Sequence, residues 1–355
     1  MKMLEGIAFY SSGHGFGHAS RQVEIINAVG ARHPGTRLFL RTAAARWLIE
    51  RTMRVPFELD DRPCDTGVVQ IDSLHLDAAE TMTRAREFYA TFDARADDEA
   101  RLLRERGLRL VIVDAAPLGC EAAARAGVPS VVISNFTWDW IYEFYPEHRH
   151  LAPDVVPKIR RAYSQARAGW RLPLYGGFAS VSPIVDVPFV ARHARHGREE
   201  TRRRLGLPLD RNLALPTFGG YGVDGFDATR VDLGHDWLVL DHFQDAPIYE
   251  AGLRYEDLVA AVDVVLTKPG YGIISECIAN DTPVVYTERG RFAEYDVLVR
   301  EMPRYLRCAH LDKASLLAGR WRDAVERAIA EPAPPERPRT DGADVVVGMV
   351  EAAAG

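Results

Sequence analysis

Residues 262–286 read VDVVLTKPGYGIISECIANDTPVVY, and this stretch decides the fold. Its largely apolar beginning, Val262–Leu266, predicts a buried strand, which the following proline and glycines bring to an end. The amphipathic segment Ile273–Ala279 predicts a helix, and Val284–Tyr286 predicts a second buried strand. Strand, turn, helix and strand in this order predict a βαβ unit, with both strands parallel in one sheet.

The glycine turn between the first strand and the helix suits an anion such as a diphosphate. Gly270 and Gly272 let the backbone approach a ligand closely, beside the positive end of the helix dipole. Lys268 lies in this turn, in a chain whose basic residues are almost all arginine, and Glu276 follows one helical turn into the helix. The stretch alone fits equally well an ordinary βαβ unit whose turn binds no ligand.

Length, composition and charge limit the class of protein. A chain of 355 residues can form two domains, and 47% hydrophobic with 26% charged residues is typical of a globular protein. The net charge of -6 argues against nucleic-acid binding, which needs a cationic surface. The first apolar segment, Gly6–Tyr10, is too short for a signal peptide, and no apolar run reaches the about 18 residues of a membrane span. We therefore expect a cytoplasmic protein.

The cysteines give no sign of a metal site or of a disulfide framework. They stand far apart in the sequence and form no C-x-x-C pair: Cys64, Cys120, Cys277 and Cys308. The chain shows no other metal-ligand cluster. We therefore expect buried thiols, no bound metal and no cofactor.

The chain opens with a second strand, glycine loop and helix. Ile7–Tyr10 predicts the strand, and the loop that follows, residues 11–21, reads SSGHGFGHASR. It differs from a dinucleotide fingerprint because His18 replaces the third glycine and no acidic residue follows about 20 residues later. An NAD site is therefore not expected. The loop instead presents His14 and His18 on a backbone that can pass close to a ligand.

Further apolar segments alternate with helical patterns along the whole chain. The segments expected to form strands are Leu38–Leu40, Pro56–Leu59, Leu108–Val113, Ser130–Ser134, Ala179–Ile184, Leu213–Thr217 and Trp237–Leu240. One continuous helix is expected in each of Glu80–Arg106 and Ala314–Ala330, and Arg289–Glu294 is expected to be a polar loop. The alternation predicts an α/β fold of two doubly wound domains that face each other across a cleft, a preferred place for small-molecule sites.

Polar and aromatic residues follow several of these strands, at the sheet edge where ligands bind in α/β proteins. Asp114 follows the strand at Leu108–Val113 and is expected either to cap the next helix or to face an acceptor. The segment Asn135–Tyr142, which contains Trp138 and Asp139, suits sugar recognition, although aromatic residues more often pack in a core. Gly219 and Gly220 form another glycine turn after Leu213–Thr217.

Together these motifs resemble GT-B glycosyltransferases of the MurG and monogalactosyldiacylglycerol-synthase type. They resemble more closely the glycosyltransferase-like N-terminal domain of plant L-arabinokinases. The residues that carry the likeness are 13–21, 64–72, 135–142, 185–188, 268–272, Ser275 and Glu276. The likeness covers only the domain that precedes the sugar kinase and therefore implies no kinase activity.

The resemblance implies the GT-B fold and a division of the chain. Residues 1–187 would form an acceptor-side Rossmann-like domain, and residues 188–340 a Rossmann-like domain that binds the nucleotide sugar. Residues 341–355 would form a C-terminal helix that packs back on the N-terminal domain. The implied reaction moves a hexose or pentose from a nucleotide-diphosphate sugar, in particular a UDP-sugar, to a hydroxyl acceptor. It would be inverting and metal-independent.

The resemblance also implies roles for individual residues. His18 or Asp139 would be the base, since a histidine with its ordinary pKa of about 6.5 can accept a proton at neutral pH. Glu276 would hold the ribose, and Glu294 would contact hydroxyls of the donor sugar. The donor-binding residues would be Gly219, Gly220, Lys268, Gly270, Tyr271, Gly272, Ser275, Glu276 and Glu294. The acceptor side would comprise His14, Gly17, Arg21, Asp114, Asn135 and Trp138.

Two residues depart from the pattern of these enzymes, and two other functions stay open. Lys268 and Tyr271 place bulky side chains in the phosphate turn, where smaller residues are common in these enzymes, and Tyr271 could stack on a ligand or restrict access. One alternative is a non-catalytic module that senses sugars or nucleotide sugars. Another is a nucleotide-sugar 2-epimerase, which shares the architecture.

Overall fold

The computed structural model describes residues 5–240 and 245–353. The chain forms two compact units, and it passes from one to the other after residues 69, 76, 190 and 340. The first unit contains Met1–Val69, Asp77–Val190 and Asp341–Gly355, and the second contains Gln70–Leu76 and Ala191–Thr340. The sequence analysis left residues 70–76 in the N-terminal domain. They belong to the second unit because Leu74 packs into its hydrophobic core.

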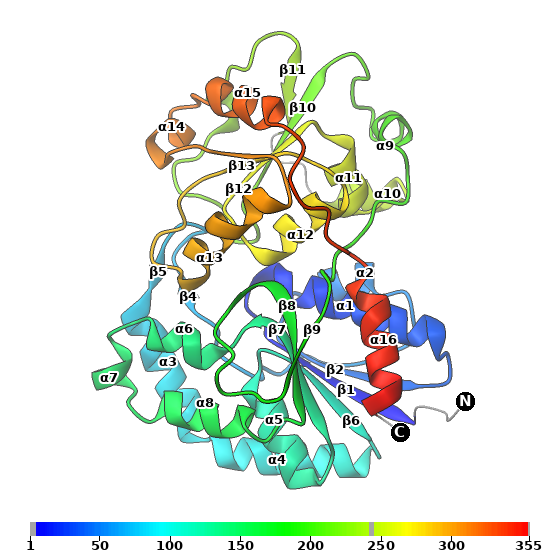
Figure 1. Cartoon of the computed structure of the whole chain (residues 1–355), viewed down its shortest axis with the longest axis vertical. Helices are drawn as coiled ribbons and strands as arrows, with labels where there is room; N and C mark the ends of the chain where they lie inside the picture. The colour runs from blue at the N-terminus through cyan, green and yellow to red at the C-terminus, as the bar shows by residue number, and fades with distance from the viewer. Residues whose placement is uncertain (1–4, 241–244, 354–355) are drawn as a thin grey trace. The chain divides into compact units, whose positions relative to one another are not determined.

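The first unit is built on a seven-stranded parallel sheet with strand order β3-β2-β1-β6-β7-β8-β9 (Figure 1). Its strands are β1 (Gly6–Ser11), β2 (Arg37–Arg41), β3 (Glu58–Asp60), β6 (Leu110–Asp114), β7 (Ser130–Phe136), β8 (Ala168–Gly176) and β9 (Ile184–Asp186). Every residue of β1, β6 and β7 is buried, as expected for central strands of a parallel sheet with both faces covered. This burial explains why the middle of each of these strands is apolar in the sequence.

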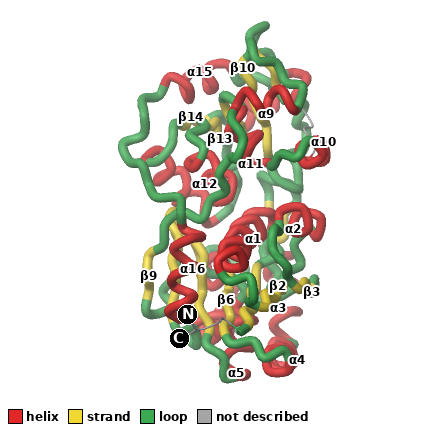
Figure 2. The backbone as a smooth tube through the Cα atoms, turned by 90° about the vertical axis from the view of Figure 1, so that its right-hand side faces the viewer, coloured by secondary structure: helices red, strands yellow, loops and turns green. Residues whose placement is uncertain are grey.

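Helices α1 (Gly15–Arg32) and α16 (Gly342–Ala353), from opposite ends of the chain, lie against each other in the first unit (Figures 1 and 2). His33 Nε2 lies 2.8 Å from Glu351 Oε1 at this contact. The other helices of the unit are α2 (Arg46–Thr52), α3 (Ala78–Ala90), α4 (Phe92–Glu105), α5 (Pro117–Ala126), α6 (Trp138–Glu143), α7 (His148–Leu151) and α8 (Val155–Tyr163). The short strands β4 (Val69–Gln70) and β5 (Leu76–Asp77) pair with each other.

Two sequence expectations for the first unit were wrong. The strand expected at Ala179–Ile184 is mostly loop, and the strand before it, β8, was missed. Pro173 and the left-handed backbone of Leu174 (φ 57°) interrupt the pattern of β8, so it does not read as a strand. The expected helix Glu80–Arg106 is two helices, α3 and α4. They separate at Thr91, whose hydroxyl bonds to the backbone oxygen of Phe88, in place of a regular helical turn.

The second unit contains a five-stranded parallel sheet with strand order β11-β10-β12-β13-β14. Its strands are β10 (Asn212–Thr217), β11 (Trp237–Val239), β12 (Val264–Thr267), β13 (Val284–Tyr286) and β14 (Cys308–His310). Its helices are α9 (Arg198–Arg204), α10 (Asp245–Glu250), α11 (Tyr255–Ala261), α12 (Tyr271–Ala279), α13 (Ala293–Glu301), α14 (Lys313–Leu317) and α15 (Arg322–Ala330), with short 3-10 helices at Ala228–Arg230 and Met302–Arg304. The stretch that opened the sequence analysis forms β12, α12 and β13, which confirms the predicted βαβ unit.

Here too the sequence reading missed some boundaries. Helix α13 begins inside the expected polar loop, so Glu294 lies in its first turn. The expected helix Ala314–Ala330 is two helices, α14 and α15, which are separated around Gly319. Gly319 has a positive φ of 72°, and a Cβ atom there would lie 2.4 Å from the backbone oxygen of Arg230. Only glycine fits this close approach, and it ends α14.

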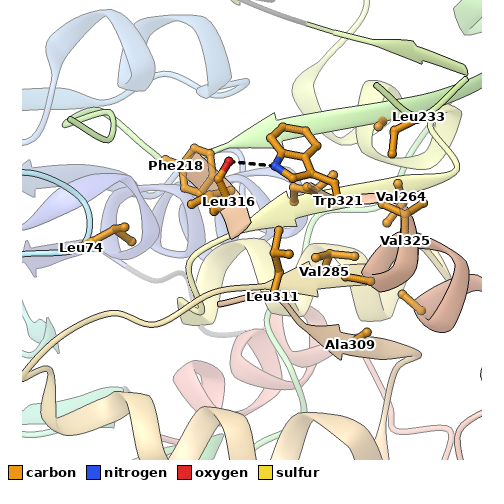
Figure 3. Close-up of a cluster of buried hydrophobic side chains, with 14 residues drawn as sticks. Leu74, Phe218, Leu233, Val264, Val285, Ala309, Leu311, Leu316, Trp321 and Val325 are labelled. Carbon is orange, nitrogen blue, oxygen red and sulfur yellow. Dashed lines mark hydrogen bonds between the residues drawn. The ribbon is translucent and has the colours of Figure 1, made fainter. Parts of the chain in front are cut away.

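Figure 3 shows the hydrophobic core of the second unit, which supports the Phe218–Gly222 turn. Trp321 is fully buried, and its indole N–H donates to the backbone oxygen of Leu316 at 3.0 Å. The ring of Phe226 stacks on Trp321 and meets Phe218 edge to face. Phe218 therefore anchors the beginning of the turn in the core. In the parts of the chain that the structure describes, no helix has the length and apolar character of a membrane span.

Candidate functional site

A buried polar cluster lies at the carboxyl ends of the central strands of the first unit. His18 and Arg21 stand three residues apart on α1, and so they share one face of the helix. Asp114 ends β6, and Ser134 and Asn135 lie near the end of β7. The two strands are neighbours of each other in the sheet, which brings side chains far apart in the sequence to one place.

Asp114 binds both basic side chains of α1. Its Oδ1 atom lies 2.8 Å from Nδ1 of His18, and its Oδ2 atom accepts a hydrogen bond from Nε of Arg21 at 2.6 Å. Arg21 also donates to Oδ1 of Asn135 at 2.7 Å and to Oγ of Ser134 at 3.0 Å. Asp114 is completely buried, and His18 and Arg21 are 6% and 5% exposed. The structure therefore brings His18, Arg21, Asp114 and Asn135 together.

The position of Asp114 excludes one of the two roles that its sequence context allowed. The residue at the N-terminus of α5 that could act as cap is Ala116, and no side chain caps this helix end. The expected helix-capping role is therefore wrong. Burial by itself would raise the pKa of Asp114, but Arg21 and His18 hold this pKa below its usual value. Nδ1 of His18 also lies 2.8 Å from Nη2 of Arg21, so its hydrogen-bond role depends on the tautomer of the ring. In the tautomer whose Nδ1–H donates to the ionised Asp114, the Nε2 lone pair of His18 can accept a proton.

Aromatic rings surround the imidazole of His18. Phe136 meets it edge to face at a centroid distance of 5.3 Å, and Trp138 lies 6.3 Å away. The ring of His14 meets Trp138 edge to face at a centroid distance of 5.8 Å. The expected base His18 and the expected acceptor-side residues His14 and Trp138 therefore form one contact group. Gly17, also expected there, lies within the first turn of α1.

The structure adds Asp65, which the sequence analysis did not single out within the Cys64–Asp72 loop. Its Oδ2 atom accepts a hydrogen bond from the indole N–H of Trp138 at 2.8 Å. Burial raises the pKa of Asp65 to about 6, against the opposing effect of hydrogen bonds from Ser12 and Trp138. Gly67 brings the same loop against His14, since a Cβ atom at Gly67 would lie 2.8 Å from Cβ of His14. The one signal in the sequence that could have indicated Asp65 is its position as a carboxylate in a glycine-containing loop, expected at a sheet edge.

Asp139, the other expected base, makes different contacts. Its Oδ2 atom accepts from Oγ of Ser180 at 2.6 Å and from Nε of Arg160 at 3.3 Å. The residue is 3% exposed and sits in the first turn of α6. Within the described residues, its hydrogen bonds thus run to Ser180 and Arg160 and not to the His18 cluster.

In the second unit, a group of charges lies at the N-terminus of α12. Gly270 immediately precedes this helix, and Nζ of Lys268 lies 3.5 Å from the position that a Cβ atom of Gly270 would take. Arg289 donates to the backbone oxygen of Pro269 at 3.3 Å, and its guanidinium lies 3.8 Å from a carboxylate oxygen of Glu294. Burial and the nearby Arg289 lower the pKa of Lys268 well below its usual value. Two basic side chains thus meet at a helix N-terminus.

Other expected donor residues of α12 are already engaged within the second unit. Glu276 is 4% exposed, and its Oε1 atom accepts from Nε of Arg192 at 2.7 Å. Arg192 also lies 3.5 Å from Glu256, so that one buried guanidinium joins two carboxylates. Ser275 Oγ donates to the backbone oxygen of Gly272 at 2.9 Å. Tyr271 is 5% exposed and packs within the unit.

The turn that contains Gly219 and Gly220 begins at the same sheet edge as the turn before α12. Thr267 Oγ1 donates to the backbone oxygen of Thr217 at 2.6 Å, which ties the ends of β12 and β10 together. Gly219 has a positive φ of 76° and its Cβ position is open, so the backbone there is accessible to a ligand. The two glycine turns are therefore neighbours, as their strands are in the sheet.

Residues 70–76 bind to the Phe218–Gly222 turn, a contact that was not expected from the sequence. The backbone N–H of Ser73 donates to the oxygen of Gly222 at 2.9 Å, and the Ser73 hydroxyl donates to the oxygen of Phe218. The Ser73 side chain is fully buried at this contact. Both ends of the turn are thus fixed by one residue from an early part of the chain. Across the described ranges, no group of three or more His, Cys, Asp or Glu side chains could hold a metal ion.

Comparisons with known proteins connect this architecture to sugar-related enzymes. No protein-family model matches the chain. Over 339 residues, 91% of this chain, it is 31% identical to an L-arabinokinase of Arabidopsis thaliana, and it spans about a third (32%) of that protein. It is also 27% identical over 219 residues to an uncharacterized glycosyltransferase of Methanopyrus kandleri. This match covers 56% of this chain and 60% of the relative.

Solved structures match almost the whole chain. The glycotransferase of kitacinnamycin has a TM-score of 0.63 at 16% identity and covers 98% of both chains. The glycosyltransferase VinC in complex with dTDP has a TM-score of 0.58 at 14% identity, covering 98% of this chain and 99% of that one. UDP-glucose:anthocyanidin 3-O-glucosyltransferase in complex with UDP also has a TM-score of 0.58, at 12% identity, covering 100% of this chain and 96% of that one. Such neighbours are GT-B glycosyltransferases, and so the chain has the expected GT-B fold.

Proposed function

We propose that the protein is a glycosyltransferase that moves a sugar from a nucleotide-diphosphate sugar to a hydroxyl acceptor. The observation that carries the proposal is the contact between Nδ1 of His18 and Asp114, which directs the other imidazole nitrogen toward a proton-accepting role. The name of the relative from Methanopyrus kandleri supports this activity, and the solved structures with UDP and dTDP support a pyrimidine nucleotide. The resemblance to the MurG and monogalactosyldiacylglycerol-synthase type favours a UDP-sugar as the donor. The cytoplasm remains the expected place of action.

The proposed reaction is a single displacement. The acceptor hydroxyl gives its proton to Nε2 of His18 while its oxygen forms a bond to the anomeric carbon of the donor sugar. The bond between that carbon and the diphosphate oxygen breaks, and the nucleoside diphosphate leaves with the electron pair. One displacement inverts the anomeric configuration. A positioned general base of this kind accelerates a reaction by about 100- to 10,000-fold.

In this proposal the second unit binds the donor. The backbone N–H groups at Gly270 and Gly272, the α12 dipole and Lys268 would face the diphosphate, with Gly219 and Gly220 beside them. These groups would stabilise the charge that develops on the leaving diphosphate. This set of positive groups supports transfer without a metal ion. Arg289 would add to the positive potential.

The same proposal assigns the remaining donor contacts. Glu276 would bind the ribose hydroxyls, and its ion pair with Arg192 would fix the carboxylate in position. Glu294 would contact hydroxyls of the donor sugar from the first turn of α13. On the acceptor side, His14 and Trp138 would border the sugar or the acceptor near the base. Asp139 remains the alternative base, at a place held by Ser180 and Arg160.

The test is nucleotide release measured with a panel of UDP- and dTDP-sugars, each with and without simple sugar acceptors. Glycosyl transfer requires release of the nucleoside diphosphate together with a new glycoside of inverted configuration. Binding without release would instead identify a sensing module, and an altered nucleotide sugar formed without any acceptor would identify a 2-epimerase. Either of these results would overturn the proposed transfer. Activity that EDTA abolishes and magnesium restores would overturn metal independence.

A further inference from the structure

The polar cluster around His18 has an unbalanced charge when the histidine is protonated. Arg21 and Asp114 form a buried ion pair, so their charges cancel. In the described part of the chain, Asp114 is the one carboxylate within ion-pair distance of His18. A proton taken up by His18 therefore adds a positive charge to a buried site whose nearest carboxylate is already neutralised by an arginine. Burying an uncompensated charge is costly.

We propose that Asp65 supplies the negative charge that stabilises protonated His18, and that it acts as a positioning residue through Trp138. This inference rests on the proposed function, in which His18 receives the proton of the acceptor. Asp65 does not need to touch the substrate for this role. Its carboxylate has to stay ionised and to lie in the same buried group as the imidazole.

The geometry places Asp65 and His18 around one indole ring. Asp65 accepts from the N–H of Trp138 at 2.8 Å, and the ring of His18 lies 6.3 Å from the Trp138 centroid. Trp138 is 1% exposed and Asp65 is 7% exposed, so little water screens the charges. The indole therefore holds the carboxylate and the imidazole in a fixed relationship.

The surroundings of Asp65 provide it with hydrogen bonds but with few other charges. Ser12 and Trp138 donate to it as neutral groups. The ionisable groups that interact with it electrostatically are His18, Cys64, Tyr89, Asp114 and Tyr142. His14 contacts the ring of Trp138, which donates to Asp65. Burial raises the pKa of the Cys64 thiol and of the two tyrosine hydroxyls, so these three groups stay neutral at physiological pH. Asp114 opposes the ionisation of Asp65, and His18 favours it.

These opposing effects determine when Asp65 carries its charge. Burial, with a contribution from Asp114, raises the pKa of Asp65 to about 6. The carboxylate is therefore mostly ionised at neutral pH and protonated in mild acid. Its support for the imidazolium is present at neutral pH and is lost as the pH falls through about 6.

The experiment is an NMR titration of the His18 ring in the ligand-free, full-length protein. The variant Asp65→Asn keeps an oxygen that can accept from the indole of Trp138 but removes the charge. The His18 titration midpoint is expected to move to lower pH by about one unit. The matched control is Glu121→Gln, which makes the same chemical change at another buried carboxylate of the first unit, bound to Arg125 and Gln165. An unchanged midpoint in Asp65→Asn, or an equal shift in Glu121→Gln, overturns the inference.

A reciprocal measurement covers the case in which Asp65→Asn does not fold. Coupling between two titrating groups acts equally in both directions. In the variant His18→Gln, the carboxyl carbon of Asp65 is therefore expected to titrate at higher pH than in the wild type. An unchanged Asp65 midpoint overturns the inference. Both titrations are read without substrate, so a failure to find sugar transfer would overturn the proposed function without affecting the measured coupling.

Discussion

Nδ1 of His18 lies 2.8 Å from Oδ1 of Asp114, and the same carboxylate forms a buried ion pair with Arg21. Asp114 therefore orients His18, while Arg21 neutralises the negative charge of Asp114. The orientation supports proton acceptance at Nε2. The neutralisation means that the charge of a protonated His18 must be balanced by another group, for which Asp65 is positioned.

Replacing His18 tests the base directly. His18→Ala is expected to lower turnover by about 100- to 10,000-fold, because the acceptor proton then has no positioned base. Donor affinity should change little, since the proposed donor residues lie in the second unit. Turnover is measured by nucleotide release, and affinity by calorimetry with UDP. The control is His235→Ala, a histidine with an exposed side chain. Unchanged turnover in His18→Ala would remove this residue from the mechanism.

Replacing Asp114 tests the ion pair with Arg21. Asp114→Asn removes the counter-charge of a buried guanidinium and is expected to lower the free energy of unfolding by about 3–5 kcal/mol. Urea unfolding at pH 7 measures this loss. The comparison is Glu80→Gln, which breaks an exposed pair with Arg84 and should change stability far less. Equal, small losses in both variants would show that the buried pair contributes no more than a surface one.

Replacing Lys268 tests the proposed anion site at the N-terminus of α12. Its lowered pKa means that the ligand-free amine holds its proton weakly, and an anionic diphosphate beside it would favour the charged form. UDP binding is therefore expected to take up protons, which calorimetry in buffers of different ionisation enthalpy detects. Lys268→Met should abolish that uptake and weaken UDP binding about 10-fold or more, whereas Lys313→Met, at an exposed contact with His75, should change neither. Full affinity and uptake in Lys268→Met would place the diphosphate elsewhere.

Replacing Glu276 tests the proposed recognition of the ribose. If its carboxylate accepts from ribose hydroxyls, the wild type should bind UDP more tightly than 2′-deoxy-UDP. Glu276→Gln should bind the two nucleotides with similar affinity, because the charged acceptor is lost. Competition binding of both nucleotides measures the ratio. Since Glu276 also pairs with buried Arg192, thermal unfolding is recorded for each variant. A ratio that Glu276→Gln leaves intact would assign the ribose to other residues.

The sequence predicts local units well where glycine and proline mark their ends. The β12–α12–β13 unit has a proline and glycines before its helix and Pro283 before its second strand, and it was read correctly. Strand β8 was missed because Pro173 lies inside it, and helix α13 because its first turn is polar. In each case packing within the unit overrides the local signal.

The parts of the site that were missed depend on contacts between distant residues. Asp65 gains its significance from Trp138, which follows it by 73 residues in the chain. Ser73 holds the Phe218–Gly222 turn, 145 residues away from its hydroxyl's partner. No periodicity or motif encodes such pairs, because they follow from how the chain returns to the same place. The glycine loops of the sequence indicated His18 and Gly270 as candidate site residues. The partners of these residues in the structure could not be predicted.

The pH dependence of stability tests the environment of Asp65. Its folded-state pKa of about 6 exceeds the about 3.9 expected for an unfolded chain, so folding favours the protonated form. The stability that this preference contributes is fully present below about pH 4 and is lost as the pH rises through about 6. Asp65→Asn, which resembles the protonated acid, should therefore raise the free energy of unfolding at pH 7 by about 2–3 kcal/mol.

Near pH 4 the same substitution should change stability little, because the wild-type carboxyl is then protonated in the folded protein. Urea unfolding of both proteins at pH 4 and pH 7 gives the comparison, with Glu121→Gln as the control for replacing a buried carboxylate by an amide. A variant that is stabilised at pH 7 while its His18 titrates at lower pH would show that Asp65 is retained for its charge, at a cost in stability. Equal stability of the variant and the wild type at both pH values would mean that folding does not disfavour the charged form of Asp65.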